Sequence, residues 1–234
     1  MTEYLFIHIP KNGGFALSKS DQLKSKLFYI DARAMHSKEY VLAVKQKMDS
    51  LKLNYQFGHC RWRDLHPDIQ FKYIGKTVAI VRNPWSRTVS QYTFAKQIME
   101  ENPMNINPTS LRPNASFEEF LQLRHIWGKT PYFWHRTTVG WYPQSDYVTD
   151  VEGDLRADIL SFENYEEDTN KYFGLNQKIP ERNVSNKSKK DYKDFYTKQT
   201  IQIIADWYKK DIDYFGFDFD TGATRNLYYE THST

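Results

Sequence analysis

The chain has 234 residues and a formal net charge of +3, from 32 Lys and Arg against 29 Asp and Glu. This length predicts one domain over residues 1–220 and a loosely ordered tail over residues 221–234, and the small charge gives no support for a nucleic-acid partner. The single cysteine, Cys60, excludes an internal disulfide framework and fits a reducing compartment. Because no apolar run reaches the roughly 18 residues of a membrane span and no secretory pattern opens the chain, we expect a cytoplasmic protein.

Apolar, β-type runs alternate with helix-type segments along the chain. In chain order, we expect strands at residues 4–9, 27–30, 55–59, 77–81 and 158–162. Between and after them, we expect helices at residues 16–26, 38–51, 85–101, 163–173 and 197–210. A further helix begins at Ser116, whose spacing to Glu119 is that of a capping box. The alternation predicts βαβ units, and therefore an α/β fold with a mostly parallel β-sheet flanked by helices.

The turn after the first expected strand carries the strongest functional signal. It reads Pro-Lys-Asn-Gly-Gly over residues 10–14. Glycines let the backbone approach an anion closely, a following helix directs N–H groups toward it, and Lys11 adds a positive charge. A strand-ending turn with a solvent-facing lysine is the structural alternative. Two Gly-Lys-Thr tripeptides, at residues 75–77 and 128–130, lack the glycine that a Walker loop has five residues earlier, which disfavours ATP or GTP hydrolysis.

A second anion-binding pattern follows the strand expected at residues 77–81. Arg82 ends this strand, Asn83 can cap the next helix, and Pro84 suits its first turn. An arginine fork, a helix N-terminus and the hydroxyl of Ser90 can jointly hold a phosphate. A capped surface helix is the structural alternative, but an arginine at a buried strand end without an anionic partner would be costly.

With both segments in place, the chain resembles sulfotransferases that use 3′-phosphoadenosine 5′-phosphosulfate (PAPS), in the carbohydrate branch that includes the heparan sulfate O-sulfotransferases. The family's Pro-Lys-Thr-Gly-Gly-Thr loop, which binds the 5′-phosphosulfate, corresponds to Pro10, Lys11, Asn12, Gly13, Gly14 and Phe15. Its Arg and Ser that bind the 3′-phosphate correspond to Arg82 and Ser90, with Asn83 in place of an Asp. The resemblance implies a P-loop-containing nucleotide hydrolase-like fold and PAPS as the cofactor, with PAP as its product.

Further blocks extend the resemblance over nearly all of residues 4–219. Residues 59–65 resemble the 6-O-sulfotransferase stretch whose histidine is the proposed base. This implies His59 as the base and Lys11 as the group that stabilises the departing PAP. A histidine with a purely structural role is the alternative. Later blocks lie at residues 144–147, 159–164, 182–185 and 211–217.

The resemblance also suggests contacts outside the two anion-binding segments. A loop at residues 182–185 helps to cover the nucleotide in this family, which implies cofactor contacts for Asn183 and Ser185. The acceptor is expected to be a hydroxyl, most simply of a glycan, and Trp62, Trp134 and His135 are candidates to contact it. Ordinary packing is the alternative for these aromatic residues. No grouping of His, Cys and Asp has metal-ligand spacing, so we expect no metal.

The loop at residues 10–15, which would bind the sulfate donor and is called the donor loop, departs from the family at two positions. Asn12 and Phe15 stand where threonine is usual, so the loop loses hydroxyls that hold the 5′-phosphate. This keeps open a non-catalytic relative that binds nucleotides or anionic glycans. A nucleotide kinase-like phosphotransferase on a similar parallel sheet is the other alternative.

Overall fold

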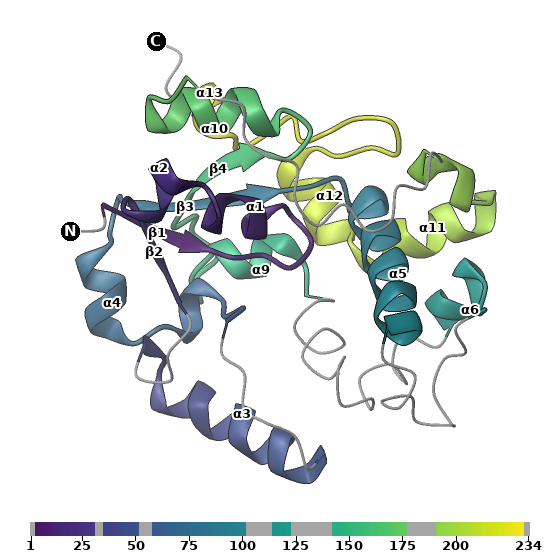
Figure 1. The fold of residues 1–234 in the computed structure, drawn as a ribbon, viewed down its shortest axis with the longest axis horizontal. Helices are drawn as coiled ribbons and strands as arrows, with labels where there is room; N and C mark the ends of the chain where they lie inside the picture. Colours follow the sequence, from purple (N-terminus) through teal and green to yellow (C-terminus); the bar gives the residue numbers. More distant parts are fainter. Residues whose placement is uncertain are drawn as a thin grey trace.

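The computed structural model describes residues 3–30, 35–51, 58–101, 114–122, 142–176 and 191–231. At its centre lies one parallel β-sheet with the strand order β2-β1-β3-β4 (Figure 1). Its strands are β1 (Tyr4–Ile7), β2 (Leu27–Tyr29), β3 (Thr77–Val81) and β4 (Asp158–Ser161). In register, Leu5 of β1 lies opposite Phe28 on one side and opposite Thr77 on the other. The expected α/β fold with a mostly parallel sheet is therefore confirmed.

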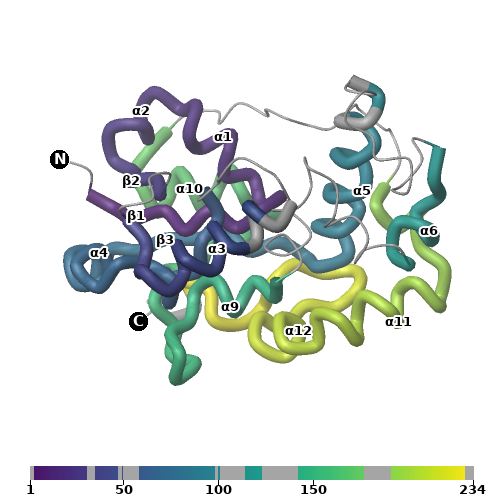
Figure 2. Tube along the Cα trace, turned by 90° about the horizontal axis from the view of Figure 1, so that it is seen from below, coloured from purple at the N-terminus to yellow at the C-terminus, as the bar shows by residue number. Residues whose placement is uncertain are grey.

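Helices flank this sheet on both faces (Figures 1 and 2). They are α1 (Gly14–Ser18), α2 (Asp21–Lys24), α3 (Lys38–Leu51), η2 (Trp62–Asp64), α4 (Pro67–Lys72), α5 (Pro84–Glu101), α6 (Phe117–Gln122), α9 (Gln144–Val148), α10 (Tyr165–Phe173), η4 (Tyr192–Phe195), α11 (Lys198–Trp207), α12 (Lys209–Phe215) and α13 (Tyr228–Thr231). Figure 2 shows α1 and α2 on one side of the strands and α9 and α12 on the other. Among the helices of the described ranges, none has both the length and the apolar character needed to cross a membrane.

Two hydrophobic clusters, one on each face of the sheet, form the core. Successive side chains of a strand point to opposite faces, so Val78 and Ile80 of β3 belong to one cluster and Ala79 and Val81 to the other. The first cluster packs against α1, α2 and α10, and the second against α5, α9, α11 and α12. Since β3 is buried along its whole length, its sequence is a continuous apolar run, as in central strands of parallel sheets.

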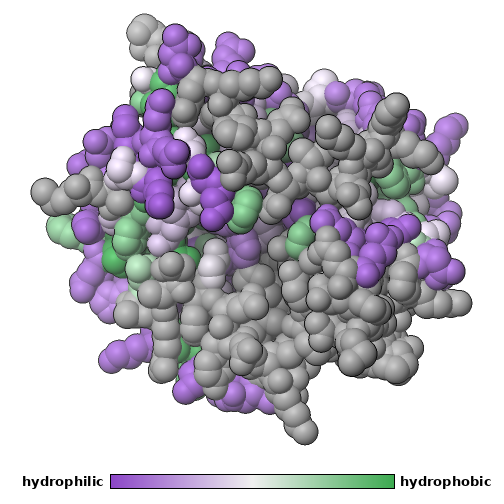
Figure 3. All heavy atoms as spheres, in the orientation of Figure 1, coloured by the Kyte–Doolittle hydropathy of each residue, from purple (hydrophilic) through white to green (hydrophobic). Residues whose placement is uncertain are grey.

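Hydrophilic residues dominate the described part of one face of the molecule (Figure 3). On the face drawn in Figure 3 they make up most of the coloured area, and hydrophobic residues form small, separate groups. The large hydrophobic side chains exposed within the described ranges are Phe15, Leu42, Phe71, Ile74 and Val151. Exposed apolar residues scattered in this way are ordinary in folded proteins.

Two segments that were expected to be single helices are interrupted. Residues 16–26 contribute to α1 and α2, which are separated at Ser20, the extended N-cap of α2 (φ −77°, ψ 119°). Residues 197–210 form α11 and the start of α12, with Tyr208 between them. A periodic apolar pattern does not reveal such breaks, because both pieces bury their apolar side chains in the same core.

Other expected elements have mixed outcomes. The capping box at Ser116 is confirmed, because its hydroxyl accepts from the Glu119 N–H at 3.1 Å and Glu119 Oε2 accepts from the Ser116 N–H at 2.8 Å. Of the strand expected at residues 55–59, residues 55–57 lie outside the described ranges. Residues 58 and 59 form a bend rather than a strand.

The C-terminal segment contacts the domain as far as Tyr229, where a loose tail was expected after Asp220. The Thr224 N–H donates to the carbonyl of Phe215 at 2.8 Å. Beside α10, the Tyr229 hydroxyl of α13 donates to the carbonyl of Asp168 at 2.9 Å. Aromatic packing and backbone hydrogen bonds thus attach a segment whose sequence has no periodicity.

This attachment predicts a difference between two glycines with left-handed backbones. A Cβ at Gly216 (φ 68°) would lie 2.3 Å from the Thr224 hydroxyl, whereas a Cβ at Gly174 (φ 63°) meets nothing within 4 Å. We expect Gly174→Ala to lower the free energy of unfolding by about 1 kcal/mol, from backbone strain alone. Gly216→Ala should cost about 2–3 kcal/mol, because a clash is added. Urea unfolding measures both; equal losses would contradict the close packing of the tail.

Candidate functional site

The strand order reverses between β1 and β3, whose carboxyl ends lie side by side at one edge of the sheet. The chain leaves β1 for β2 on one side, and β3 lies on the other side of β1. In open parallel sheets, ligands bind where the strand order reverses in this way. Residues 10–14 and Arg82, the two expected anion-binding segments, come soon after these two strands. The fold therefore joins segments that are 71 positions apart, and Arg82 Nη1 donates to the Lys11 carbonyl at 3.0 Å.

The loop at residues 10–14 is shaped by two residues with positive φ. These are Lys11 (φ 71°) and Gly13 (φ 79°), which is also the N-cap of α1. A Cβ at Gly13 would lie 2.8 Å from a ring carbon of Tyr165, and one at Gly14 would lie 2.4 Å from the His8 ring. Both glycines are therefore required where they stand, and their backbone is closely packed.

The side chains of this loop point in different directions. Asn12 is 1% exposed and turned into the protein, where its Nδ2 donates to a β3 carbonyl at 2.7 Å and to Gln144 Oε1 at 2.6 Å. Lys11 Nζ lies 4.1 Å from the ring centroid of Phe94 on α5. The Phe15 side chain is 42% exposed. Asn12, which replaces the family's threonine, thus serves the scaffold, and binding of an anion by Lys11 and the loop backbone stays a prediction.

Arg82 is a half-buried cation that directly follows β3. Its Nε donates to the Ser86 hydroxyl at 2.9 Å, and its guanidinium carbon lies 4.1 Å from the Phe162 ring centroid. Burial lowers the pKa of Arg82 to about 10, while the nearby Glu163 carboxylate acts in the opposite direction. None of the ion pairs found within the described ranges includes Arg82. Arg82 is therefore charged at neutral pH and suited to an external anion.

Asn83 explains one departure from the family pattern. As expected, its Oδ1 caps α5, accepting from the Trp85 N–H at 3.0 Å and the Ser86 N–H at 3.2 Å. Its Nδ2 donates to the carbonyls of Asp218 and Thr221, each at 2.8 Å. The aspartate usual in the family has no donor for these two carbonyls, so an amide is required here.

The Asn83 contacts predict a strong effect of a single-atom change. Asn83→Asp keeps the helix cap but sets a carboxylate oxygen against two carbonyl oxygens, so we expect the free energy of unfolding to fall by about 2–3 kcal/mol at pH 7. The matched control is Asn164→Asp, because Asn164 is the N-cap of α10 and makes no side-chain capping bond. Urea unfolding compares the two, and a loss no larger than that of the control would contradict the proposed role of the amide.

Two side chains of α5 serve the scaffold and the site differently. Arg87 is 1% exposed, and it donates to the carbonyls of Pro10 at 3.2 Å and Tyr142 at 3.1 Å. It therefore holds the donor loop from inside. Ser90 is half-buried one turn beyond Ser86. Its contact with a phosphate stays a prediction.

His59 lies beside the donor loop. Its Nδ1 is 2.8 Å from the His8 carbonyl oxygen, and the two imidazole centroids are 4.4 Å apart. Because a carbonyl only accepts, Nδ1 carries the proton of the neutral ring and Nε2 is the basic nitrogen. The His8 ring in turn lies against Gly14. The expected base and the donor loop are thus close together, while the catalytic role of His59 stays a prediction.

The acceptor-contact and remaining cofactor-contact candidates gain little support. Trp62 is 5% exposed and packs in the core, so it offers an acceptor little surface. Trp134, His135, Asn183 and Ser185 lie outside the described residues. In the part of the chain that the structure describes, no group of three or more His, Cys, Asp or Glu residues could hold a metal ion.

Three further residues shape the site and were not assigned from sequence. Gln144 contacts both anion-binding segments, Ser86 holds Arg82, and Phe162 lies under its guanidinium. A signal was present for each of them, since Gln144 and Phe162 lie in later family blocks and Ser86 lies four positions before Ser90. Their partners are distant in sequence, so the contacts themselves required the fold.

The comparison with protein families identifies the chemistry that this geometry serves. Residues 6–218 match the model described as the sulfotransferase family. The chain belongs to the sulfotransferase family. Comparisons with curated proteins and with solved structures found no match. The family match includes both anion-binding segments and His59, and it supports a sulfotransferase that performs sulfuryl transfer in general. The kinase-like alternative has no comparable support.

Proposed function

We propose that this sulfotransferase moves the sulfuryl group of PAPS to a hydroxyl of a carbohydrate acceptor. The observation that carries the proposal is the direct contact between the two anion-binding segments, from Arg82 to the carbonyl of Lys11. This contact supports a ligand with anionic groups at two ends, because each segment can then bind one of them. PAPS has this form, and the sulfotransferase family generally uses it as sulfate donor.

The residues at this edge of the sheet suit such a donor. Lys11 and the backbone from Pro10 to Phe15 would hold the 5′-phosphosulfate, and Arg82 with Ser90 would hold the 3′-phosphate. Burial disfavours the charged Arg82, so this guanidinium gains from an anionic partner. Asn183 and Ser185 complete the proposed cofactor contacts.

In the proposed reaction, one residue of this chain accepts a proton and another stabilises a developing negative charge. When bound, PAPS supplies a sulfur whose bond to the 5′-phosphate oxygen breaks as its bond to the acceptor oxygen forms. His59 Nε2 accepts the proton of the acceptor hydroxyl, since its Nδ1 donates to the His8 carbonyl. Lys11 stabilises the negative charge that develops on the departing phosphate. The His8 ring contacts both the His59 ring and Gly14. This arrangement supports a base and a donor loop that act on the same sulfuryl group.

The acceptor class rests on the resemblance to the heparan sulfate O-sulfotransferases. Trp134 and His135 are the proposed acceptor contacts, and the core position of Trp62 makes it the weakest of the original candidates. We further propose a cytoplasmic location. It is supported by the single cysteine, Cys60, which is buried.

A transfer assay tests this function. The protein is incubated with PAPS carrying a labelled sulfate and with a panel of desulfated glycosaminoglycans, phenols and peptides. The proposal predicts label on a carbohydrate and stoichiometric release of PAP. Label on the phenols or peptides alone would contradict the carbohydrate acceptor. PAP binding without transfer to any acceptor would instead support the non-catalytic alternative, which the inward-turned Asn12 and the loss of loop hydroxyls favour.

A further inference from the structure

The side chain of Gln144 binds the backbone of Arg82 as a neighbouring strand would. Gln144 is fully buried, with 0% exposure, at the start of α9. Its Oε1 accepts from the Arg82 N–H at 2.9 Å, and its Nε2 donates to the Arg82 carbonyl at 2.7 Å. Arg82 directly follows β3, whose pairing with β4 ends at Val81. Gln144 thus supplies the hydrogen bonds that the sheet no longer provides.

The same amide also binds the donor loop. Gln144 Oε1 accepts a second hydrogen bond, from Asn12 Nδ2 at 2.6 Å. Asn12 is buried and donates to the Ile80 carbonyl at 2.7 Å as well. One oxygen atom therefore receives a donor from each of the two anion-binding segments. A shift of either segment would break a buried hydrogen bond, which is costly because the buried group then has no partner.

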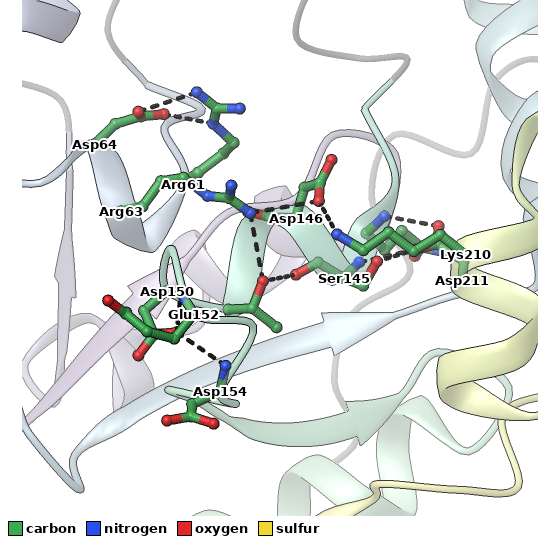
Figure 4. A network of polar contacts seen from close by, with 12 residues as sticks. Arg61, Arg63, Asp64, Ser145, Asp146, Asp150, Glu152, Asp154, Lys210 and Asp211 are labelled. Carbon is green, nitrogen blue, oxygen red and sulfur yellow. Dashed lines mark hydrogen bonds and ion pairs between the residues drawn. The ribbon is translucent and has the colours of Figure 1, made fainter.

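Gln144 is itself held from the opposite side. The carboxylate of Asp211 on α12, 0% exposed, accepts from the N–H groups of Gln144 at 2.7 Å and Ser145 at 2.8 Å, and from the Ser145 hydroxyl at 2.9 Å. Figure 4 shows Ser145 beside Asp211, with Asp146 bound by Lys210 and Arg63. These contacts fix α9 against α12, so the Gln144 side chain extends from a rigid support.

We propose that Gln144 is a positioning residue that keeps the loop at residues 10–14 and Arg82 at a fixed separation, and so sets the preference for a nucleotide with phosphates at both ends. That the ligand is PAP rests on the proposed function, whereas the hydrogen bonds of Gln144 to Asn12 and Arg82 do not depend on it. Displacing a binding group by about 1 Å can cost about 100-fold in a positioned reaction. Loss of the Gln144 amide should therefore affect PAP more than 5′-AMP, which lacks the 3′-phosphate.

A ligand-free experiment tests the link first. The Arg82 N–H donates to Gln144 Oε1. Hydrogen exchange of the Arg82 amide, measured by NMR, should therefore respond differently to Gln144→Ala and to Gln144→Glu. In the alanine variant it should accelerate at least about tenfold relative to the β3 amides. In the glutamate variant, which keeps an acceptor oxygen, it should change little. An unchanged Arg82 amide in the alanine variant overturns the link.

A second experiment uses the pH dependence of Gln144→Glu. The charged carboxylate cannot donate to the Arg82 carbonyl, but burial raises the pKa of such a carboxyl, and its protonated form can donate. Relative to wild type at the same pH, we expect PAP affinity to be about tenfold weaker at pH 8 and largely regained at pH 5.5. The alanine variant should show no such recovery. The matched control is Gln202→Glu on the exposed surface of α11, where the glutamine binds Asp206.

The outcomes separate this inference from the proposed function. If wild type binds PAP but the glutamate variant binds PAP and 5′-AMP with the wild-type ratio at both pH values, Gln144 does not set the preference. If wild type fails to bind PAP, the proposed donor is wrong, and the exchange of the Arg82 amide alone decides whether Gln144 positions the two segments.

Discussion

Replacing Arg82 by alanine should weaken PAP binding by about 100-fold while changing the affinity for 5′-AMP less than about fivefold. The guanidinium is the proposed partner of the 3′-phosphate, and a charge-assisted, forked contact of this kind contributes about 2–3 kcal/mol. Because the pKa of Arg82 is lowered only to about 10, the group stays protonated from pH 6 to 8, and the effect should not depend on pH in that range. Calorimetric titration measures both dissociation constants.

Two further variants make the Arg82 result specific. Arg82→Lys keeps a charge but loses the geometry that reaches both Ser86 and the Lys11 carbonyl, so its PAP affinity should lie between wild type and alanine. Arg156→Ala is the control, since Arg156 pairs with Asp150 in a surface loop and should leave PAP binding unchanged. Equal losses for PAP and 5′-AMP in the alanine variant would show that Arg82 does not contact the 3′-phosphate.

Replacing His59 by alanine should lower the rate of sulfuryl transfer by about 100- to 10,000-fold, the range expected for a positioned general base. PAP affinity should stay within about twofold, because neither proposed phosphate contact involves the imidazole. Single-turnover transfer from PAPS measures the rate, and the titration used for Arg82 measures the affinity. Added imidazole should restore part of the rate, since the missing group is a base.

The His59 result also has a control and an opposing outcome. His66 caps α4, where its ring accepts from the Asp68 N–H at 3.3 Å, and His66→Ala should leave transfer unchanged. A His59→Ala protein that transfers sulfate at the wild-type rate would show that the contact with the His8 carbonyl is structural only.

Local sequence patterns predicted the elements that carry the site. The apolar run of β3 and the glycine turn after β1 both follow from short-range rules on burial and backbone freedom. The meeting of Lys11 and Arg82 followed from the parallel sheet, because strands of one direction end at the same edge. The family match over residues 6–218 then agrees with the resemblance to sulfotransferases that these two segments carry.

The directions of individual side chains could not be predicted in the same way. Asn12 turns inward because Gln144 lies beside it, and Gln144 is 132 positions away. Trp62 is an aromatic residue three positions after His59, yet it packs in the core. The C-terminal segment has no periodicity, but it is attached through contacts such as Tyr229 to the Asp168 carbonyl. These side-chain directions and contacts depend on residues that are distant in the sequence, which local sequence patterns do not reveal.

The most direct test of the account is a calorimetric titration of the wild-type protein with PAP, 5′-AMP and ATP with magnesium. Two linked anion-binding segments predict saturable PAP binding at least about tenfold tighter than that of either other nucleotide. Equal affinities for PAP and 5′-AMP, or a magnesium-dependent preference for ATP, would contradict the central claim that these two segments hold a nucleotide with phosphates at both ends.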